Sequence, residues 1–516
     1  MADDSSTLTL GPLDTLTGSA RGLPAVPALT ILWHPDLDRV GDVAPLTGFL
    51  ESDVVELNRE APIFFTPGSS VGRAIDHRAM SLDNPPLRFA STRGRLELRP
   101  GSGTTQVEVD GEPFTRSREV DASALRRGVV ITVGRGFVFC LHTVHYPISR
   151  SPAMGLLGSS DAIEDVRRAI TRTPDDKTLV LIRGESGTGK ELAAKALHST
   201  GARSTGPFIS VNTGALRSET AAAALFGHEK GAFTGATDAQ PGYFREAHGG
   251  TLFLDEIGLM PYDVQASLLR VLEDQTVHSL GTSRPRKVDV RVIAATDVAL
   301  EQAVKSGRFL PSLHNRLTNG YPISLPPLRD RRPDVGLLLV AFLRQQFGGA
   351  GELQRIQWSG ADGRGWLSSR AIASIALSHL PGNVRDLEGL ARALRTCSGP
   401  GARDTRTVIA ERLAVLEELA PASDGQASSK AKGPRDLAGA LEASRWNRQR
   451  AMKVLNVSKA TFYRLLGREP DVARLLHLSE QDLLRDLRAC DGDLSRLAAK
   501  LQLPEDLVAR RLGDRR

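Results

Sequence analysis

Hydrophobic residues between positions 28 and 144 occur in short runs separated by turn-forming residues. The runs are rich in Val, Ile, Thr and Phe, a composition typical of β-strands. Asp110-Gly111 separates two of them and is a strong signal for a tight turn. The pattern predicts an all-β sandwich or barrel in this part of the chain. The predicted strands are ALTILWH (28–34), LELRP (96–100), TQVEVDGEPF (105–114) and GVVITVGRGFVFCLHTV (128–144).

Beyond residue 155 the pattern changes to short apolar strands, each followed by an amphipathic helical stretch. This alternation continues to about residue 325 and predicts a parallel sheet covered by helices. Three of the strands are TLVLIRG (178–184), TLFLDEI (251–257) and VDVRVIAATD (288–297).

Helical patterns dominate the rest of the chain. Residues 330–397 are predicted to be mainly helical. PASDGQASSKAKGP (421–434) is small and polar, which indicates a flexible linker, and short helices follow it. A chain of 516 residues is too long for one hydrophobic core, so several domains are expected.

Composition narrows the class of protein. No run of about 18 apolar residues is present, so no membrane-spanning helix is predicted. The N-terminal MADDSSTLTL is acidic and lacks the apolar core of a secretion signal. The cysteines, Cys140, Cys397 and Cys490, are far apart and lack metal-ligand spacing. We therefore expect a cytoplasmic protein with free thiols, and its net charge of +6 permits a nucleic-acid partner without requiring one.

The stretch GESGTGKE (184–191) follows a predicted buried strand and opens a predicted helix. In that position, the backbone N–H groups of a phosphate-binding loop and the helix N-terminus face a nucleotide. Lys190 would reach the outer phosphates. Glu191 stands where Ser or Thr usually offers a hydroxyl to Mg²⁺, so the metal would depend on phosphates, water and a second strand. The expected nucleotide-binding residues here are Gly184, Glu185, Ser186, Gly187, Thr188, Gly189, Lys190 and Glu191.

The second strand is GGTLFLDEI, which ends in two acidic residues. Asp255 is placed to hold Mg²⁺ directly or through water, and Glu256 is suited to polarise an attacking water. The alternative is a carboxylate pair that only caps a helix. Between the loop and this pair lies GHEKGAFTGA (227–236), where glycines permit bending and Phe233 offers apolar contact area. A turn that merely links two helices is the alternative there.

Five motifs occur in sequence: the phosphate loop, GHEKGAFTGA, TLFLDEIGLMPYDVQASLLRVLED, LPPLRDRR and LPGNVRDLEGL. Together they resemble the AAA+ ATPase module of bacterial enhancer-binding proteins, the activators of sigma-54 RNA polymerase. The resemblance covers about residues 155–397. It implies ATP and Mg²⁺ as cofactors and a homo-oligomeric ring, expected to be a hexamer assembled from dimers. In this family the GAFTGA loop touches sigma-54. That contact is thereby assigned to Gly231, Ala232, Phe233, Thr234, Gly235 and Ala236.

The resemblance implies further roles, one residue at a time. Asn212 in FISVNTGAL matches the residue that switches Glu256 between active and idle orientations. Arg385 in PGNVRDL matches the lid sensor that reads the bound nucleotide. Arg316 in LHNRL matches an arginine presented to the ATP of the neighbouring subunit, so each site would be completed only in a ring.

Two positions depart from the family pattern. The strand sensor is usually Asn and is Asp297 here, and an Arg that usually follows the Phe of GRFLPSLHNRL is Leu310 here. Arg308 lies close to the second position. Neither change removes a group that hydrolysis requires, so we expect an active ATPase, slowed at most by these two changes.

The segment LAGALEASRWNRQRAMKVLNVSKATFYRLL (437–466) is predicted to form three short helices. It resembles the Fis-type helix-turn-helix that usually ends these activators. Residues 435–468 hold eight Lys/Arg and two Asp/Glu, an excess suited to the phosphates of double-stranded enhancer DNA. A plain helical hairpin is the alternative. Candidate DNA contacts are Arg448, Ser458, Lys459, Thr461, Tyr463 and Arg464.

A second copy of this unit is predicted at residues 471–516. LRACDGDLSRLAAKLQLPEDLVARRL (487–512) aligns without gaps on residues 441–466, with six identities. Nine Lys/Arg balance nine Asp/Glu in this copy, and Glu505 and Asp506 stand at the start of its predicted recognition helix. We expect it to fold as a helix-turn-helix without reading DNA, and to pack on the first copy or pair subunits.

The N-terminal β domain, by its position and its last strands, resembles a forkhead-associated domain, a β-sandwich that binds phosphothreonine. That would make it a sensor with a phosphoprotein partner. Arg59 in LNRE matches the phosphate-contacting arginine, but the following Ser-x-x-His pattern is absent, and SLDNPPLRF (81–89) stands near its place. A purely structural sandwich is the alternative. As a sensor, the domain should change the level of activation and leave ATP turnover and DNA binding intact.

The expected protein is therefore multidomain: an N-terminal β-sandwich, a central α/β AAA+ P-loop ATPase with a helical lid, and a C-terminal all-α helix-turn-helix. Its expected function is ATP-dependent activation of transcription from enhancer DNA. The alternatives are an AAA+ remodeller of proteins unrelated to transcription and a DNA-binding regulator with a weakened ATPase. The expected segments are a disordered N-terminus (1–27), the sensor (28–148), the ATPase α/β subdomain (155–327), its lid (328–397), a linker (398–434) and two helix-turn-helix units (435–468 and 471–516).

Overall fold

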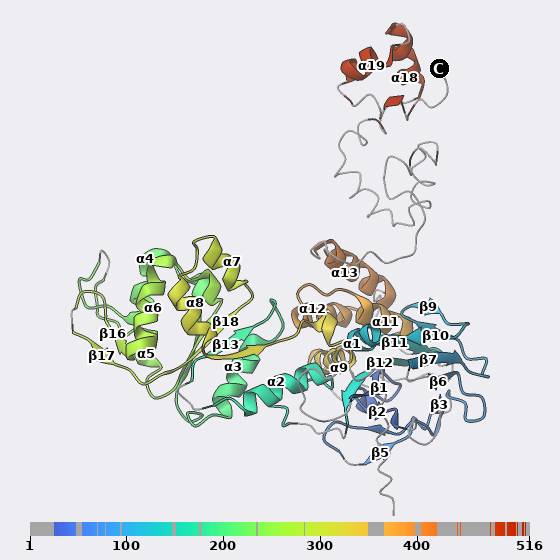
Figure 1. Ribbon diagram of the computed structural model, residues 1–516, viewed down its shortest axis with the longest axis horizontal. Coiled ribbons are helices and arrows are strands. Elements are labelled where there is room, and N and C mark those ends of the chain that lie inside the picture. Colours follow the sequence, from blue (N-terminus) through green and yellow to red (C-terminus); the bar gives the residue numbers. More distant parts are fainter. Residues whose placement is uncertain are drawn as a thin grey trace, which may run out of the picture. The chain divides into compact units, whose positions relative to one another are not determined.

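The computed structural model contains two compact units, Met1–Pro421 and Ala422–Arg516, whose elements are labelled in Figure 1. Among the described helices, none is both long enough and apolar enough to cross a membrane. The described residues are 25–47, 54–69, 71–77, 79–92, 95–146, 151–174, 178–233, 236–282, 284–348, 366–397 and 404–419, and in the second unit 441, 444, 475, 480–490, 493–501, 503, 508–509 and 511.

Two antiparallel sheets form the N-terminal domain. Their strands are β1 (Ala25–Trp33), β2 (Val43–Pro45), β3 (Val54–Leu57), β4 (Phe64–Phe65), β5 (Gly72–Arg73), β6 (Leu87–Thr92), β7 (Arg95–Pro100), β8 (Val107–Val109), β9 (Glu112–Pro113), β10 (Arg118–Val120), β11 (Val129–Val133) and β12 (Phe137–His145). The larger sheet has the order β5-β4-β2-β1-β12-β11-β8-β9, and the smaller has the order β10-β7-β6-β3. A 3-10 turn, η2 (Leu37–Arg39), follows β1, and a short helix, α1 (Ala122–Arg127), precedes β11.

Local sequence explains the turns of this domain. Asp110 and Gly111 have φ angles of 52° and 81°, and they form the expected tight turn between β8 and β9. The first strand begins at Ala25, earlier than the domain start expected at residue 28. Residues 1–24, most of the expected disordered N-terminus, lie outside the described residues.

A five-stranded parallel sheet forms the centre of the ATPase region, as the sequence predicted. Its strands are β13 (Val180–Arg183), β14 (Phe208–Asn212), β15 (Thr251–Asp255), β18 (Arg291–Thr296) and β19 (Tyr321–Ser324), in the order β14-β15-β18-β13-β19. Alternate residues of β13 enter different apolar cores, Leu181 on one face and Val180 and Ile182 on the other. Both faces are therefore buried, which explains the continuous apolar run.

Helices connect and cover these strands. They are α2 (Asp161–Thr171), α3 (Lys190–Ser199), α4 (Ser218–Phe226), α5 (Tyr243–Glu246), α6 (Tyr262–Asp274), α7 (Leu300–Lys305) and α8 (Pro311–Thr318), with 3-10 turns η4 (Thr213–Ala215) and η5 (Ile257–Leu259). A small hairpin, β16 (Thr276–Val277) with β17 (Arg286–Lys287), follows α6.

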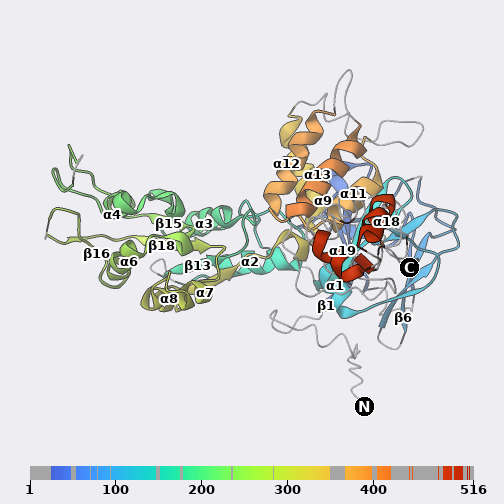
Figure 2. The ribbon, with the colours of Figure 1, turned by 90° about the horizontal axis from the view of Figure 1, so that it is seen from above.

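The lid is helical, and Figure 2 shows its helices gathered into one bundle. It comprises η6 (Leu328–Asp330), α9 (Asp334–Gln346), α11 (Ser369–Leu377), α12 (Val384–Arg395) and α13 (Thr405–Leu419). The helix α13 corrects the expected linker at 398–434. Its apolar residues recur at helical spacing, so they form one buried face that packs in the lid core; these residues are Val408, Ile409, Leu413 and Leu416. The small polar stretch 421–434 lies outside the described residues.

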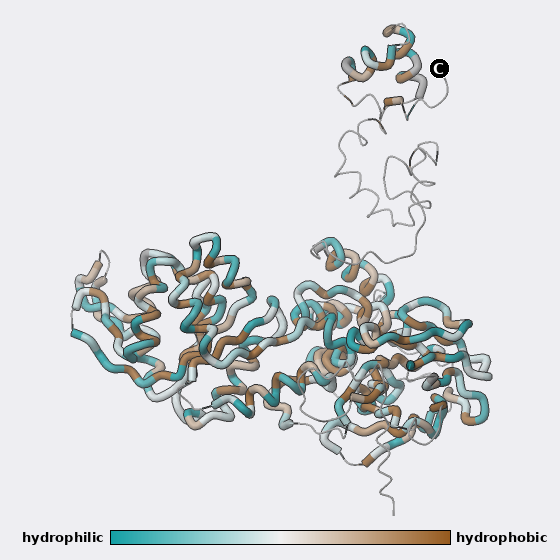
Figure 3. Tube along the Cα trace, in the orientation of Figure 1, coloured by the Kyte–Doolittle hydropathy of each residue, from teal (hydrophilic) through white to brown (hydrophobic). Residues whose placement is uncertain are grey.

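The larger sheet of the N-terminal domain is apolar on both faces. In β12, Phe137, Phe139 and Leu141 pack in the core between the two sheets. Val138 and Cys140, which point the other way, belong to the core of the lid. The brown hydrophobic colour along β12 and β1 in Figure 3 follows this two-sided burial. The N-terminal domain and the lid thus share a hydrophobic core.

The described part of the second unit contains two helices, α18 (Glu480–Ala489) and α19 (Leu494–Leu501). Both fall within the second predicted helix-turn-helix copy. Leu483, Leu497 and Val508 are buried there, and so is Leu441 from the first copy. The candidate DNA contacts Arg448, Ser458, Lys459, Thr461, Tyr463 and Arg464 lie outside the described residues, so the helix-turn-helix remains a prediction.

Candidate active site

The phosphate loop lies between β13 and α3. Gly187 and Gly189 have φ angles of 76° and 104°, which glycine adopts without strain. Lys190 begins α3 and is buried, and its Nζ donates to the carbonyl oxygens of Gly184 and Glu185 at 2.9 and 3.2 Å. These contacts hold the ammonium at the loop, the position from which it would reach the outer phosphates of a nucleotide.

Side chains from the lid hold the phosphate loop. Arg329 donates to both carboxylate oxygens of Glu185 at 2.6 and 2.7 Å, and Asn383 Nδ2 lies 3.2 Å from the same carboxylate. Arg331 Nη2 donates to the carbonyl oxygen of Thr188 at 3.0 Å. Hydrogen bonding from Arg329 holds the pKa of the Glu185 carboxyl below its usual value, so the pair is ionic.

The predicted lid sensor and the backbone beside it also reach the loop. Arg385 is exposed, and its Nη1 donates to Ser186 Oγ at 3.2 Å. A Cβ on Gly187 would lie 2.1 Å from the carbonyl oxygen of Gly382, so the lid backbone approaches the loop at a point where no side chain fits. The lid and the phosphate loop are therefore in direct contact.

Glu191 does not replace the Mg²⁺-binding hydroxyl that Ser or Thr offers at this position in related loops. It is exposed on α3, and its carboxylate pairs with Lys195 Nζ at 2.7 Å, one turn along the helix.

The acidic pair lies at the carboxyl end of β15, the same edge of the parallel sheet as the phosphate loop. Glu256 has a φ of 54°, a left-handed conformation that is strained for residues other than glycine. The Thr213 hydroxyl lies 2.8 Å from the carbonyl oxygen of Glu256 and 3.0 Å from that of Asp255, and it stabilises this turn. Burial raises the pKa of the Asp255 carboxyl above its usual value, with smaller effects from its neighbours.

Asn212 and Glu256 lie at the carboxyl ends of two neighbouring strands. Asn212 ends β14 and pairs in register with Asp255 of β15. Its Oδ1 accepts a hydrogen bond from the Ala215 N–H at 3.1 Å. A Cβ on Gly214 would lie 2.8 Å from Glu256 Oε2 and 3.4 Å from Asn212 Oδ1, so both side chains lie beside this glycine.

Asp297 and Arg316 lie at opposite ends of the sheet. Asp297 is exposed directly after β18, the strand between β15 and β13, at the edge that carries the phosphate loop. Arg316 is exposed on α8, and its Nη2 donates to the Leu272 carbonyl at 2.9 Å. It lines a cavity with Leu179, which precedes β13, so it lies near the amino ends of the strands and away from this subunit's phosphate loop.

The carboxylates suit Mg²⁺ only together with phosphate oxygens. Among the described residues, no group of three His, Cys, Asp or Glu side chains is arranged to hold a metal ion. Asp255 is half-buried at the end of β15, and one of its oxygens, Oδ1, accepts the Glu256 N–H at 3.0 Å. It fits the expected role of ligand, directly or through water, to a Mg²⁺ that arrives with ATP.

The GAFTGA loop is closed at its base by backbone hydrogen bonds. The Gly231 N–H donates to the Ala236 carbonyl at 2.8 Å, and Gly231 has a φ of 80°, so the expected bending occurs at this glycine. Phe233 is 38% exposed, and its ring centroid lies 5.0 Å from that of His228. Thr234 and Gly235 lie outside the described residues.

The loop is anchored to Gln240, which follows it in the chain, and to the connection between β16 and β17. His228 exchanges both backbone hydrogen bonds with Gln240, at 3.0 and 2.9 Å, and the Glu229 N–H donates to the Leu280 carbonyl at 2.9 Å. A Cβ on Gly281 would lie 2.9 Å from Ala232 Cβ, so the two loops pack closely.

Several side chains that contact the site were not predicted from the sequence. Arg329, Arg331, Asn383 and Thr213 were not among the predicted site residues. The first three stand in LPPLRDRR and LPGNVRDLEGL, motifs that carried the family resemblance without an assigned role at these positions. Thr213 directly follows Asn212 and could have been found only by noting that a buried hydroxyl needs a partner.

A phosphate loop, an acidic pair on a neighbouring parallel strand and a helical lid that contacts the loop define a P-loop module of the AAA+ class. The sequence profile of the Sigma-54 interaction domain matches residues 156–323. The chain is 46% identical over 243 residues to the DNA-binding transcriptional regulator NtrC of Escherichia coli (strain K12), which covers 47% of this chain and 50% of that protein. It is 36% identical over 353 residues to NtrC of Proteus hauseri, covering 64% of this chain and 69% of that protein. The chain belongs to the family of sigma-54-dependent transcriptional activators.

The chain spans about half the length of several curated relatives that it matches, including the E. coli protein. Among solved structures, a crystal structure of NtrX from Brucella abortus in complex with ATP is similar at 27% identity, with 69% of this chain and 68% of that chain covered and a TM-score of 0.44.

Proposed function

We propose that this chain is an ATP-dependent transcriptional activator that binds enhancer DNA and uses ATP hydrolysis in a ring to remodel closed complexes of sigma-54 RNA polymerase. The observation that carries the proposal is the direct path from the acidic pair to the GAFTGA loop. Thr213 bonds the backbone of Asp255 and Glu256 and begins η4. From η4 the chain runs into α4, which ends at Phe226, and the segment GHEKGAFTGA begins at the next residue, Gly227.

Through this path, a change in the bound nucleotide would move the GAFTGA loop. Asn212 caps η4 through its Oδ1, and Glu256 Oε2 lies beside Gly214 of η4, so a reorientation of either side chain would alter η4. The helix α4 has nine residues, about 13 Å, and transmits such a change as a rigid rod. The loop that follows its far end contains the exposed Phe233, which would present apolar area to sigma-54.

Hydrolysis follows from the placement of the charged groups. Lys190 would contact the outer phosphates, Glu256 would orient the attacking water, and Asp255 would hold the metal. Bound Mg²⁺ supplies positive charge that offsets the charge developing on the transferred phosphoryl group. The strained backbone at Glu256 is consistent with a residue whose orientation matters more than local stability.

A ring is needed because Arg316 cannot reach the ATP bound to its own subunit. It lies at the amino ends of the strands, whereas the phosphate loop follows the carboxyl end of β13. Presented to a neighbour, such an arginine can be worth about 10³–10⁵ in rate. We infer a closed homo-oligomer, with a hexamer as the expected size and dimers as its building blocks.

The proposal is tested by transcription in vitro. Purified polymerase carrying sigma-54 or the housekeeping sigma factor is assayed with the chain, with and without ATP. Activation that requires both sigma-54 and ATP is the expected result. ATP turnover without any effect on sigma-54 polymerase would favour the alternative of a protein remodeller, and DNA binding without ATP turnover would favour a regulator with a decayed ATPase.

We also propose that the second unit binds enhancer DNA through its first helix-turn-helix copy. The support is the excess of eight Lys/Arg over two Asp/Glu in residues 435–468 and the match to a Fis-type segment. The second copy, to which α18 and α19 belong, has balanced charge and would pack on the first copy or pair subunits.

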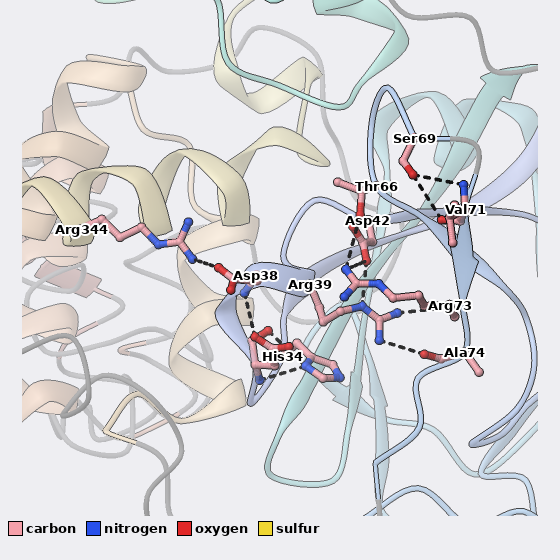
Figure 4. A network of polar contacts seen from close by, with 11 residues as sticks. His34, Asp38, Arg39, Asp42, Thr66, Ser69, Val71, Arg73, Ala74 and Arg344 are labelled. Carbon is pink, nitrogen blue, oxygen red and sulfur yellow. Dashed lines mark hydrogen bonds and ion pairs between the residues drawn. The ribbon is translucent and has the colours of Figure 1, made fainter. Parts of the chain in front are cut away.

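For the N-terminal domain we propose a forkhead-associated β-sandwich with a phosphoprotein partner, and the structure offers a second candidate arginine besides Arg59. Arg73 is half-exposed, and its Nη2 lies 3.4 Å from Thr66 Oγ1 and 3.4 Å from Asp42 Oδ2 (Figure 4). Arg39 also pairs with Asp42, at 2.7 Å, so two arginines share one carboxylate and leave a net positive charge beside a hydroxyl. A phosphate group suits that arrangement.

The two arginines are separated by mutation. Binding of phosphothreonine peptides to the full chain is measured for Arg73→Ala and Arg59→Ala, and we expect weak binding that only Arg73→Ala removes. Loss with Arg59→Ala alone would restore the assignment from the sequence. A parent chain that binds no phosphothreonine peptide would make the domain a structural sandwich, and binding that neither variant affects would place the phosphate site away from both arginines.

A further inference from the structure

The face of the N-terminal domain that contacts the lid is continuous with the lid's own core. Leu32, Val130, Val138 and Cys140 are no more than 1% exposed, and they belong to the same apolar cluster as the buried residues of α9, α11, α12 and α13. Separating the two parts would expose all of this surface to water, at a free-energy cost that grows with its area. A sensor on a flexible tether has no such core.

Gly336 marks the closest approach of the two parts. It lies in α9, and a Cβ at this position would be 2.1 Å from the carbonyl oxygen of Leu32 and 2.6 Å from its Cα. Both atoms belong to the backbone of β1, so no side-chain movement could make room. A glycine inside a helix lowers helix stability, and the contact with β1 gives the physical reason for it here.

Polar contacts border the shared core on several sides. Arg332 Nη1 donates to the Gly128 carbonyl at 2.9 Å, and Ser369 Oγ donates to the Gly134 carbonyl at 3.0 Å. The Glu108 carboxylate is buried and accepts from Arg370 Nε at 2.8 Å. A buried carboxylate needs such a partner, so removal of the lid would leave it exposed to water or unpaired.

The turn η2 connects this interface to Arg39 and Arg73, the two arginines that share the Asp42 carboxylate. Asp38 forms an ion pair with Arg344 of α9, and the next residue, Arg39, donates to the carbonyl oxygens of Ala74 and Arg73 at 2.8 and 3.2 Å (Figure 4). Adjacent residues of one short turn therefore contact the lid and the strand that carries Arg73.

The lid end of this connection reaches the nucleotide site. Asn383 and Arg385 contact the phosphate loop, and Asp334, the first residue of α9, accepts hydrogen bonds from the backbone of Ser159 and Ser160 at 2.7 Å each. The lid is thus attached both to the phosphate loop and to the start of α2.

We propose that the N-terminal domain stays docked on the lid and moves with it as one body, so that it sets the position of the lid over the phosphate loop and thereby the affinity for nucleotide. The proposal rests on the proposed ATPase function and adds the route by which the domain regulates it. It also replaces the expectation that the domain can be lost without effect on ATP turnover. Binding events on the two parts are then coupled, and the coupling is reciprocal.

The test compares two Gly→Ala substitutions in the full chain. Gly336→Ala places a methyl group against the β1 backbone. Gly389→Ala, in α12 of the same lid, meets only the end of the Arg412 side chain at 3.4 Å and serves as the matched control. Thermal unfolding and the Kd of a fluorescent ADP analogue are measured for both variants.

We expect Gly389→Ala to match the parent chain or to melt slightly higher, because alanine favours a helix. Gly336→Ala should melt lower and change the Kd for the ADP analogue at least five-fold. Identical behaviour of both variants would overturn the proposal. A parent chain that binds no nucleotide would refute the proposed function, while the melting comparison would still report whether the two parts are docked.

A disulfide provides a second test that does not depend on a destabilised variant. A Cβ on Gly41 would lie 3.5 Å from Leu337 Cβ of α9, within the range that a disulfide requires. The Gly41→Cys/Leu337→Cys chain is compared in its oxidised and reduced forms, which share any strain from the φ of 94° at position 41. We expect the crosslink to form rapidly. The Kd and the ATP turnover of the oxidised form should lie within two-fold of those of the reduced form. Slow crosslinking, or loss of turnover on oxidation, would mean that the domain must separate from the lid.

Discussion

The carboxylate of Glu185 and the guanidinium of Arg329 form a two-point ionic contact between the phosphate loop and the lid. The two residues are 144 positions apart in the chain. Paired hydrogen bonds of this kind define an orientation as well as a distance. The contact therefore fixes the orientation of the loop relative to the lid.

Arg329→Ala should raise the KM for ATP while changing kcat less, because Arg329 positions the loop and does not touch the reacting atoms. Both side chains are about a third exposed or more, so we expect a loss of about 1 kcal/mol, roughly five-fold in KM. Steady-state ATP hydrolysis measures both parameters. The control is Arg392→Ala, which removes an exposed ion pair with Glu388 elsewhere on the lid. An equal effect of both substitutions would show that the contact with Glu185 has no special role.

Lys190→Ala should abolish ATP turnover and transcriptional activation together. Lys190 is the predicted cation for the outer phosphates, and its ammonium already lies at the loop carbonyls. Hydrolysis and sigma-54 transcription are measured on the same preparation, with thermal unfolding to confirm that the variant is folded. Full activation by a folded Lys190→Ala chain would refute the mechanochemical function.

Thr234→Ala should separate the two activities. The segment around it is closed by the contact between Gly231 and Ala236 and lies beyond the far end of α4 from the acidic pair. ATP turnover should therefore stay within about two-fold, while sigma-54 binding and promoter opening fall at least ten-fold. Turnover and activation that decline in strict proportion would make the loop a structural element.

Local motifs were predicted well from the sequence because a few neighbouring residues determine them. The phosphate loop, the Asp110-Gly111 turn and the parallel sheet needed no knowledge of distant partners. The helix α13 was missed because the small polar stretch at 421–434 was extended back over residues whose apolar spacing is helical. Periodicity should have taken priority over composition there.

Contacts between distant segments could not be predicted from the sequence. The run FVFCL in β12 carried a signal, since a strand of an antiparallel sheet with one face in water would alternate with polar residues. That run predicts a second buried face without saying that the lid covers it. The contact between Glu185 and Arg329 left no local pattern at all, because each residue is an ordinary surface charge until the fold brings them together.

The raised pKa of Asp255 predicts an acid limb in the pH profile of ATP turnover. The carboxylate must be ionised to hold Mg²⁺, and burial makes the proton harder to lose. Activity should therefore fall, as the pH is lowered, at a pH above the range of an ordinary aspartate, whose pKa is about 3.9. Metal and proton compete for the same oxygens, so more Mg²⁺ should move the limb to lower pH. A limb that Mg²⁺ does not move would belong to another group.

The same shift predicts that Asp255→Asn stabilises the nucleotide-free fold at neutral pH while it removes Mg²⁺-dependent ATP binding. A carboxyl whose pKa is higher in the folded state favours folding at low pH, and that contribution is lost as the pH rises through the folded-state pKa. At neutral pH the ionised, half-buried Asp255 is thus a cost to stability, which a neutral amide of similar shape avoids. Thermal unfolding at pH 7 should show a rise of a few degrees at most, shrinking as the pH is lowered toward the Asp255 pKa. An unchanged or lower melting temperature at pH 7 would show that the carboxylate is better solvated in the folded protein than its burial indicates.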